Sequence, residues 1–89
     1  MASHNAGMEA YSLGQYSEAI NYFIEAQKSM PANASIAMNL LQAISQRGRL
    51  NEDLIYLAHK CMNVIDEAEL PKDQRKRYSF IKEQIQQML

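Results

Sequence analysis

Apolar residues recur every three or four positions along most of the chain, which is the period of an amphipathic helix. Between residues 16 and 30 they form one stripe, which consists of Tyr16, Ala19, Ile20, Phe23, Ala26 and Met30. Pro31 predicts the end of this helix, because the residue before a proline avoids helical backbone geometry. A shorter helix is expected upstream from the spacing of Ala6, Met8, Ala10, Tyr11 and Leu13.

Glycines and asparagines mark the expected ends of these helices. Gly14 predicts a tight turn after the first helix, because glycine readily adopts the left-handed conformation that ends a helix. A third helix is expected to begin after Asn33, a suitable N-cap, and to end at about Arg47, where Gly48 supplies another turn.

Two further helices complete the pattern. The acids that follow Asn51 predict the start of a fourth helix, because negative charge favours the amino end of a helix dipole. Apolar positions recur as far as Ala68, so we expect this helix to stop near residues 70–71. A fifth is expected over residues 72–88, with an apolar face of Tyr78, Ile81, Ile85 and Met88. The pattern therefore predicts one all-α domain of five helices over residues 1–89.

The two turn glycines, Gly14 and Gly48, lie 34 residues apart, and a fixed period of this length is typical of stacked helical hairpins. The segment from Gly7 to Pro31 reads G-x2-A-Y-x2-G-x-Y-x2-A-I-x-Y-F-x2-A-x4-P, which resembles the motif of the tetratricopeptide repeat family. The resemblance implies a right-handed stack of two hairpins and a capping helix, at about residues 3–31, 33–70 and 72–88.

The same resemblance implies that Gly7 and Ala19 are the small residues at which the paired helices cross. The second hairpin departs from the motif, because Leu41 stands where a small residue is expected. Its closing Pro71 also follows Pro31 by 40 residues instead of 34. The second unit is therefore expected to be irregular, with an extended second helix.

A second resemblance involves the NLLQA helix, the acidic fourth helix and the closing LPKDQRKRY segment. Together they look like the tail of bacterial response regulators in which such repeats follow a phosphoacceptor receiver domain. The 89 residues contain neither a parallel-sheet pattern nor an acidic phosphorylation pocket. This resemblance therefore implies an output or adaptor domain in signal transduction, without catalysis.

In tetratricopeptide proteins the first helix of each hairpin lines a concave groove, so the resemblance implies that a protein or peptide segment binds there. The residues expected to face it are His4, Asn5, Met8, Tyr11 and Ser12 from the first helix, and Ser35, Met38, Asn39, Gln42 and Gln46 from the third. Amides suit an extended peptide backbone, while methionine and tyrosine give adaptable apolar contacts. The alternative is that Tyr11 and Met38 only pack the fold and that the amides are solvated. Some family members grip a terminal carboxylate with a clamp of lysine, arginine and asparagine. Only Asn39 clearly matches that set, so a clamp of this kind is not expected.

The formal net charge of −1 gives no overall attraction to nucleic acid or to an anionic membrane, and neither is an expected partner. The basic run KDQRKR at residues 72–77 is a local exception. Lys72, Arg75 and Lys76 are expected at the end of the groove, where they would attract an acidic peptide. The alternative is a solvated helical turn whose charges contribute little.

The sequence offers no arrangement typical of catalysis or metal binding. His59 and Cys61 lie two residues apart on one predicted helix and so point in different directions. Cys61 continues an apolar stripe, which predicts a buried thiol. Neither enzymatic activity, a metal nor a cofactor is expected. A single cysteine and the lack of a membrane-length apolar run favour a cytoplasmic location.

Self-association is the alternative function. Two and a half repeats leave a terminal face exposed, which an isologous homodimer would bury. The apolar residues outside the main stripes, and hence candidates for such a contact, are Tyr16, Tyr22, Phe80 and Leu89.

Overall fold

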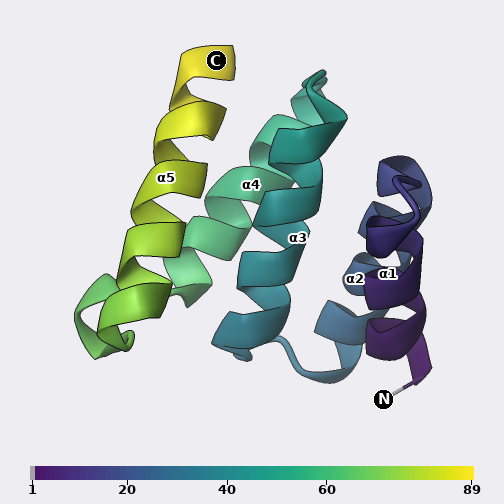
Figure 1. Ribbon diagram of the computed structural model, residues 1–89, viewed down its shortest axis with the longest axis horizontal. Coiled ribbons are helices and arrows are strands. Elements are labelled where there is room, and N and C mark those ends of the chain that lie inside the picture. The colour runs from purple at the N-terminus through teal and green to yellow at the C-terminus, as the bar shows by residue number, and fades with distance from the viewer. Residues whose placement is uncertain (1) are drawn as a thin grey trace.

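The computed structural model describes residues 2–89, which are almost entirely helical (Figure 1). The elements are α1 (Ala2–Ser12), α2 (Tyr16–Ser29), α3 (Ala34–Arg47), α4 (Glu52–Val64), the short 3-10 helix η1 (Glu67–Glu69) and α5 (Lys72–Met88). No strand occurs in this part of the chain. The prediction of an all-α fold with five α-helices is therefore confirmed.

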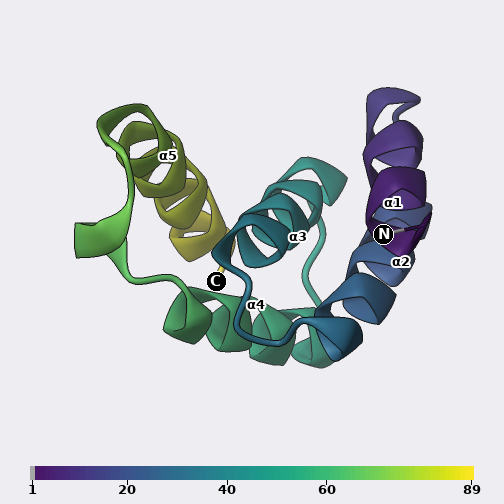
Figure 2. The same ribbon diagram turned by 90° about the horizontal axis from the view of Figure 1, so that it is seen from below.

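The helices form two layers, with α1, α3 and α5 side by side and α2 and α4 behind them (Figure 1). Each of α1 to α3 packs against the helix that follows it, whereas α5 packs mainly against α3 and η1. Seen from below, the chain follows a U-shaped curve whose arms are α1 and α5, with α3 between them (Figure 2). The helices α1, α3 and α5 thus form the inner face of the curve. None of the helices within residues 2–89 is long and apolar enough to cross a membrane.

The predicted turns and caps are present. Gly14 and Gly48 adopt positive φ angles of 77° and 79° and reverse the chain between paired helices. The side chain of Asn33 accepts a hydrogen bond from the amide of Ile36 at 3.0 Å, which caps α3. Asn51 caps α4 in the same way, at 2.8 Å.

The close crossing of the first two helices depends on Gly7. A Cβ atom at this position would lie 2.5 Å from Cε1 of Phe23, so the aromatic ring occupies the space that any other side chain would need. Ala19 is fully buried as well. Both small residues therefore lie in the close packing of this hairpin, and the crossing at Ala19 that the resemblance implies stays a prediction.

The extended fourth helix is the prediction that proves wrong. α4 ends at Val64, because Ile65 adopts an extended conformation with φ −87° and ψ 117°. Asp66 then accepts a hydrogen bond from the amide of Ala68 at 3.1 Å and starts η1. A capping carboxylate offers the backbone this alternative to a continued helix. The side chain of Ile65 stays buried, so the apolar pattern continues past the end of the helix.

At the other end of the chain, α1 begins at Ala2, earlier than its apolar residues suggest.

Candidate functional site

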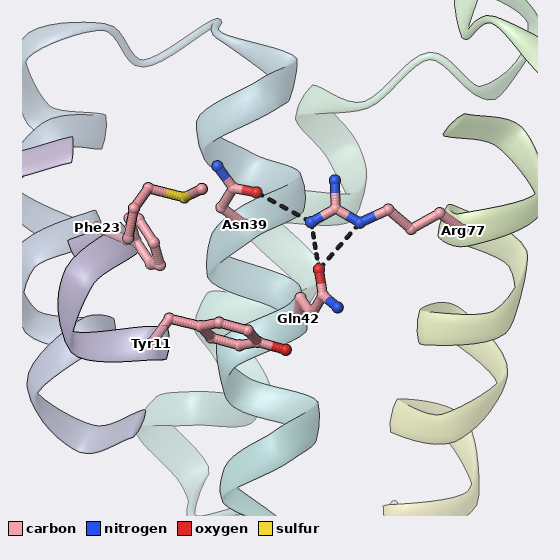
Figure 3. Close-up of a pocket in the computed structure, with 6 residues that line it drawn as sticks. Tyr11, Phe23, Asn39, Gln42 and Arg77 are labelled. Carbon is pink, nitrogen blue, oxygen red and sulfur yellow. Dashed lines mark hydrogen bonds between the residues drawn. The ribbon is translucent and has the colours of Figure 1, made fainter. Parts of the chain in front are cut away.

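Two adjoining cavities lie on the inner face, between α1 and α5 and over α3. Figure 3 shows the residues that line the first of them. The first has a volume of about 180 Å³ and is lined by Met8, Tyr11, Phe23, Asn39, Gln42 and Arg77. The second, of about 570 Å³, shares Asn39 and Arg77 with the first and is otherwise lined by His4, Ala34, Ser35, Met38, Leu70, Pro71 and Gln74. We refer to the two cavities together as the inner cleft.

Arg77 extends from α5 to α3 and forms the polar centre of the inner cleft (Figure 3). Its Nε donates to Oε1 of Gln42 at 2.9 Å, and its Nη2 donates to the same oxygen and, at 3.0 Å, to Oδ1 of Asn39. On α5 itself, Nη1 donates to Oε1 of Gln74 at 3.3 Å. Every one of these acceptors is a neutral amide oxygen.

No carboxylate accompanies the Arg77 guanidinium within residues 2–89, where the side-chain ion pairs are Lys28–Glu25 and Lys82–Glu67. Partial burial lowers the pKa of Arg77, because loss of water disfavours the charged form. Buried charges in proteins are usually paired with an opposite charge. The inner cleft therefore carries a positive charge that is balanced by amide dipoles alone.

The α1 side of the inner cleft is largely apolar. Met8 is about half exposed, and Tyr11 is half-buried with its ring edge-on to Tyr16 at a centroid distance of 5.3 Å. Burial raises the pKa of Tyr11, and Tyr16 adds to this effect, whereas Arg77 and Gln42 oppose it. Tyr11 is thus a neutral phenol at physiological pH, able to donate a hydrogen bond to a ligand.

His4 connects α1 to this network. Its Nε2 lies 2.9 Å from Nδ2 of Asn39, the same amide whose oxygen accepts from Arg77. The imidazole ring also packs against Phe23, at a centroid distance of 5.8 Å. Side chains from all three inner helices are therefore joined in one hydrogen-bonded chain.

The structure brings together only part of the residue set predicted to face the groove. Met8, Tyr11, Asn39 and Gln42 line the same cavity, and Met38 lines the adjoining one although it is almost fully buried. Of the other three predicted residues from α1, His4 lines the second cavity, whereas Asn5 and Ser12 are exposed and line neither cavity. The Ser12 hydroxyl donates to the carbonyl oxygen of Glu9 at 2.8 Å.

The three basic residues predicted at the end of the groove, Lys72, Arg75 and Lys76, line neither cavity. Nη2 of Arg75 donates to the carbonyl oxygens of Leu70 at 3.1 Å and Ala68 at 3.4 Å, so this side chain holds the segment before α5. Lys76 is exposed and lines neither cavity. The arginine of the inner cleft is Arg77, which the sequence analysis did not single out. The sequence did contain a signal for Arg77. This residue lies four positions before Ile81, which belongs to the predicted apolar face of the fifth helix, and residues four apart share one face of a helix.

Cys61 lines neither cavity and is fully buried. Its sulfur accepts a hydrogen bond from Nε2 of the buried Gln27 at 3.6 Å, which links α4 to α2. Burial raises the pKa of Cys61 to about 11, so the thiol stays protonated at physiological pH. The predicted buried thiol is confirmed. Within the described part of the chain, no group of histidine, cysteine and acidic side chains is arranged to hold a metal ion.

Comparison of the chain with protein-family models, with curated proteins and with solved structures finds no match. The resemblance to tetratricopeptide repeats therefore stays a prediction that rests on the sequence motif.

Proposed function

We propose that the inner cleft binds a protein or peptide segment, and that an acidic side chain or terminal carboxylate of this segment lies beside Arg77. The observation that carries the proposal is the Arg77 guanidinium, which neutral amides hold in place inside a partly apolar cavity. A carboxylate from a ligand would supply the charge that the surrounding residues lack.

The hydrogen-bonding capacity of Arg77 supports this role. A guanidinium has five N–H donors, and the four bonds to Gln42, Asn39 and Gln74 leave one donor on Nη1. The bond from Nη1 to Gln74, at 3.3 Å, is the longest of the four. A ligand carboxylate would use the remaining donor and replace the Gln74 amide with little loss.

The shape and chemistry of the inner cleft favour a peptide over a compact small molecule. The two cavities continue one another over α3, where Asn39 and Gln42 offer amide groups to an extended backbone. Apolar side chains flank these amides on both sides of α3: Met8 and Tyr11 from α1, and Leu70 from the segment before α5. Such alternation of apolar walls and polar groups suits a segment with apolar residues next to an acidic one.

A peptide-array experiment tests the proposal. The array would carry random peptides, each paired with an analogue in which Asn replaces Asp and Gln replaces Glu. It would be probed with the wild type and with the variants Arg77→Met and Arg75→Met. We expect the wild type and Arg75→Met to prefer the acidic member of each pair. Arg77→Met should lose this preference, with affinity falling roughly 10- to 100-fold for the loss of a charged hydrogen bond. Equal binding of acidic and amide peptides by the wild type would contradict the proposal.

Self-association is a second candidate, favoured by large apolar side chains that remain exposed at both arms of the curve. On the first hairpin, Leu13 and Tyr22 line a shallow hollow together with Glu9 and Glu18. On α5, Phe80 is 61% exposed. Light scattering over a range of concentrations tests this function: a mass of twice 10.2 kDa that falls in a Phe80→Ser variant would support it. A constant monomeric mass would exclude it.

A further inference from the structure

The chain of hydrogen bonds through His4, Asn39 and Arg77 defines the protonation state of His4. A guanidinium only donates hydrogen bonds, so the Asn39 oxygen must face Arg77, as the distance of 3.0 Å from Nη2 to Oδ1 indicates. The Asn39 NH2 group then faces Nε2 of His4 at 2.9 Å and donates to it. Nε2 must therefore be unprotonated, and the imidazole is neutral with its proton on Nδ1.

We propose that His4 is a proton-controlled switch of the inner cleft. When His4 takes up a proton, its bond to Asn39 breaks and a second positive charge appears beside Arg77, which strengthens the binding of an acidic ligand. The stronger binding of an acidic ligand rests on the proposed function, whereas the loss of the bond between His4 and Asn39 does not.

The hydrogen-bonding rules leave protonated His4 no way to keep the chain intact. An imidazolium donates from both nitrogens, so its Nε2–H would meet the NH2 group of Asn39. Rotation of the Asn39 amide by half a turn would relieve that conflict and place the NH2 group against the Arg77 guanidinium instead. In either arrangement one of the two bonds is lost.

The surroundings of His4 determine the effect of its charge. The cavity around it is lined by residues of α3, by Leu70 and Pro71, and by Gln74 and Arg77 of α5. On the side of α2 the neighbour is the Phe23 ring. Among these residues Arg77 is the ionisable one, and within residues 2–89 no carboxylate forms an ion pair with His4. A ligand carboxylate would offset the charge of an imidazolium at His4, and proton uptake and ligand binding therefore reinforce each other.

The first test needs no ligand. Side-chain nitrogen NMR on the full chain should show His4 with its proton on Nδ1 at about pH 7.5, and the Asn39 NH2 resonances should move on acidification to about pH 5.5. His59 on α4, whose side chain is exposed, serves as an internal control. In a His4→Gln variant, a glutamine oxygen replaces the Nε2 acceptor but does not titrate, so the Asn39 resonances should stay constant. A proton on Nε2 of His4 at high pH, or equal movement in His4→Gln, would overturn the switch.

The second test uses the capped pentapeptide Ala-Ala-Glu-Ala-Ala and its Gln analogue in NMR titrations at the same two pH values. The Glu side chain stays mostly ionised at both, since its pKa is about 4.3 in water. We expect the Glu peptide to bind the wild type roughly five-fold more tightly or better at the lower pH, and His4→Gln with no such gain. Binding without a difference between wild type and His4→Gln would overturn the switch and leave the proposed function standing. No binding of the Glu peptide at either pH would instead overturn the proposed function and the ligand-linked part of the switch.

Discussion

Arg77 of α5 and Gln42 of α3 are 35 residues apart in the chain and are joined by a hydrogen bond of 2.9 Å from Nε to Oε1. This bond lies on the inner face, beside the apolar contact that Ile81 and Ile85 make with the core. Since α5 packs mainly against α3, the pair positions the charged group of the inner cleft and also fastens the last helix.

The Arg77–Gln42 pair predicts an asymmetry between two substitutions. Gln42→Ala would leave the guanidinium partly buried with fewer acceptors, and we expect it to lower the free energy of unfolding by about 1–3 kcal/mol. Arg77→Met removes the charge and keeps the aliphatic stem, so we expect a smaller loss or none. Urea denaturation followed by circular dichroism measures both. A larger loss in Arg77→Met would mean that the guanidinium contributes mainly to stability.

The contact between Gly7 and Phe23 predicts that Gly7→Ala destabilises the protein. In an unhindered helix this change adds up to about 1 kcal/mol of stability. Here the new Cβ would lie 2.5 Å from the Phe23 ring, so we expect a net loss of about 1–3 kcal/mol. The double variant Gly7→Ala, Phe23→Leu should lose less stability than the sum of the two single losses, because Phe23→Leu removes the ring atoms that the new Cβ atom would meet. Additive losses in thermal unfolding would contradict the proposed overlap.

The left-handed conformation of Gly48, with φ at 79°, predicts a graded response to substitution. Gly48→Ala should lower stability by about 1–2 kcal/mol, because a Cβ atom strains this conformation. Gly48→Asn should lower it less, since asparagine tolerates left-handed geometry. A Cβ atom at this position meets no atom closer than 3.9 Å, so steric overlap does not contribute. The melting temperatures of the two variants should rank accordingly, and the reverse order would refute the explanation.

The raised pKa of Cys61 predicts a loss of stability at alkaline pH. The pKa of this thiol rises from 9.0 to about 11 on folding, because burial disfavours the thiolate. The contribution is therefore fully present below pH 9.0 and is lost as pH rises through about 11. The slope between these values is about −1.4 kcal/mol per pH unit.

A comparison with Cys61→Ala isolates this effect from other groups that titrate in the same range. The difference in unfolding free energy between wild type and variant should shrink as pH rises above 9.0. A difference that is constant with pH would show that the thiol ionises equally in both states. At neutral pH, a thiol reagent should modify wild-type Cys61 only as fast as the protein unfolds.

Local chemistry in the sequence determined most of the helix boundaries. Asn33 and Asn51 cap their helices, and Gly14 and Gly48 turn the chain, because each acts through bonds or backbone angles within a few residues of itself. The apolar periods also indicated which face of each helix is buried. For α4 the period misled, since Ile65 remains in the core after the helix has ended.

The residues of the inner cleft could be predicted from the sequence only in part, because the cleft combines side chains from separate helices. Met8, Tyr11, Asn39 and Gln42 could be placed on one face from helical spacing alone. The partner residue on α5 depends on how the segment between α4 and α5 sets the rotation and height of that helix against α3. This packing turns Arg77 toward Asn39 and Gln42 and Arg75 toward the backbone of that segment. The sequence by itself determined which segments are helices and which residue types they present. Tertiary structure decided which side chains from distant helices meet, because such contacts depend on the relative placement of whole helices, which no local interaction specifies.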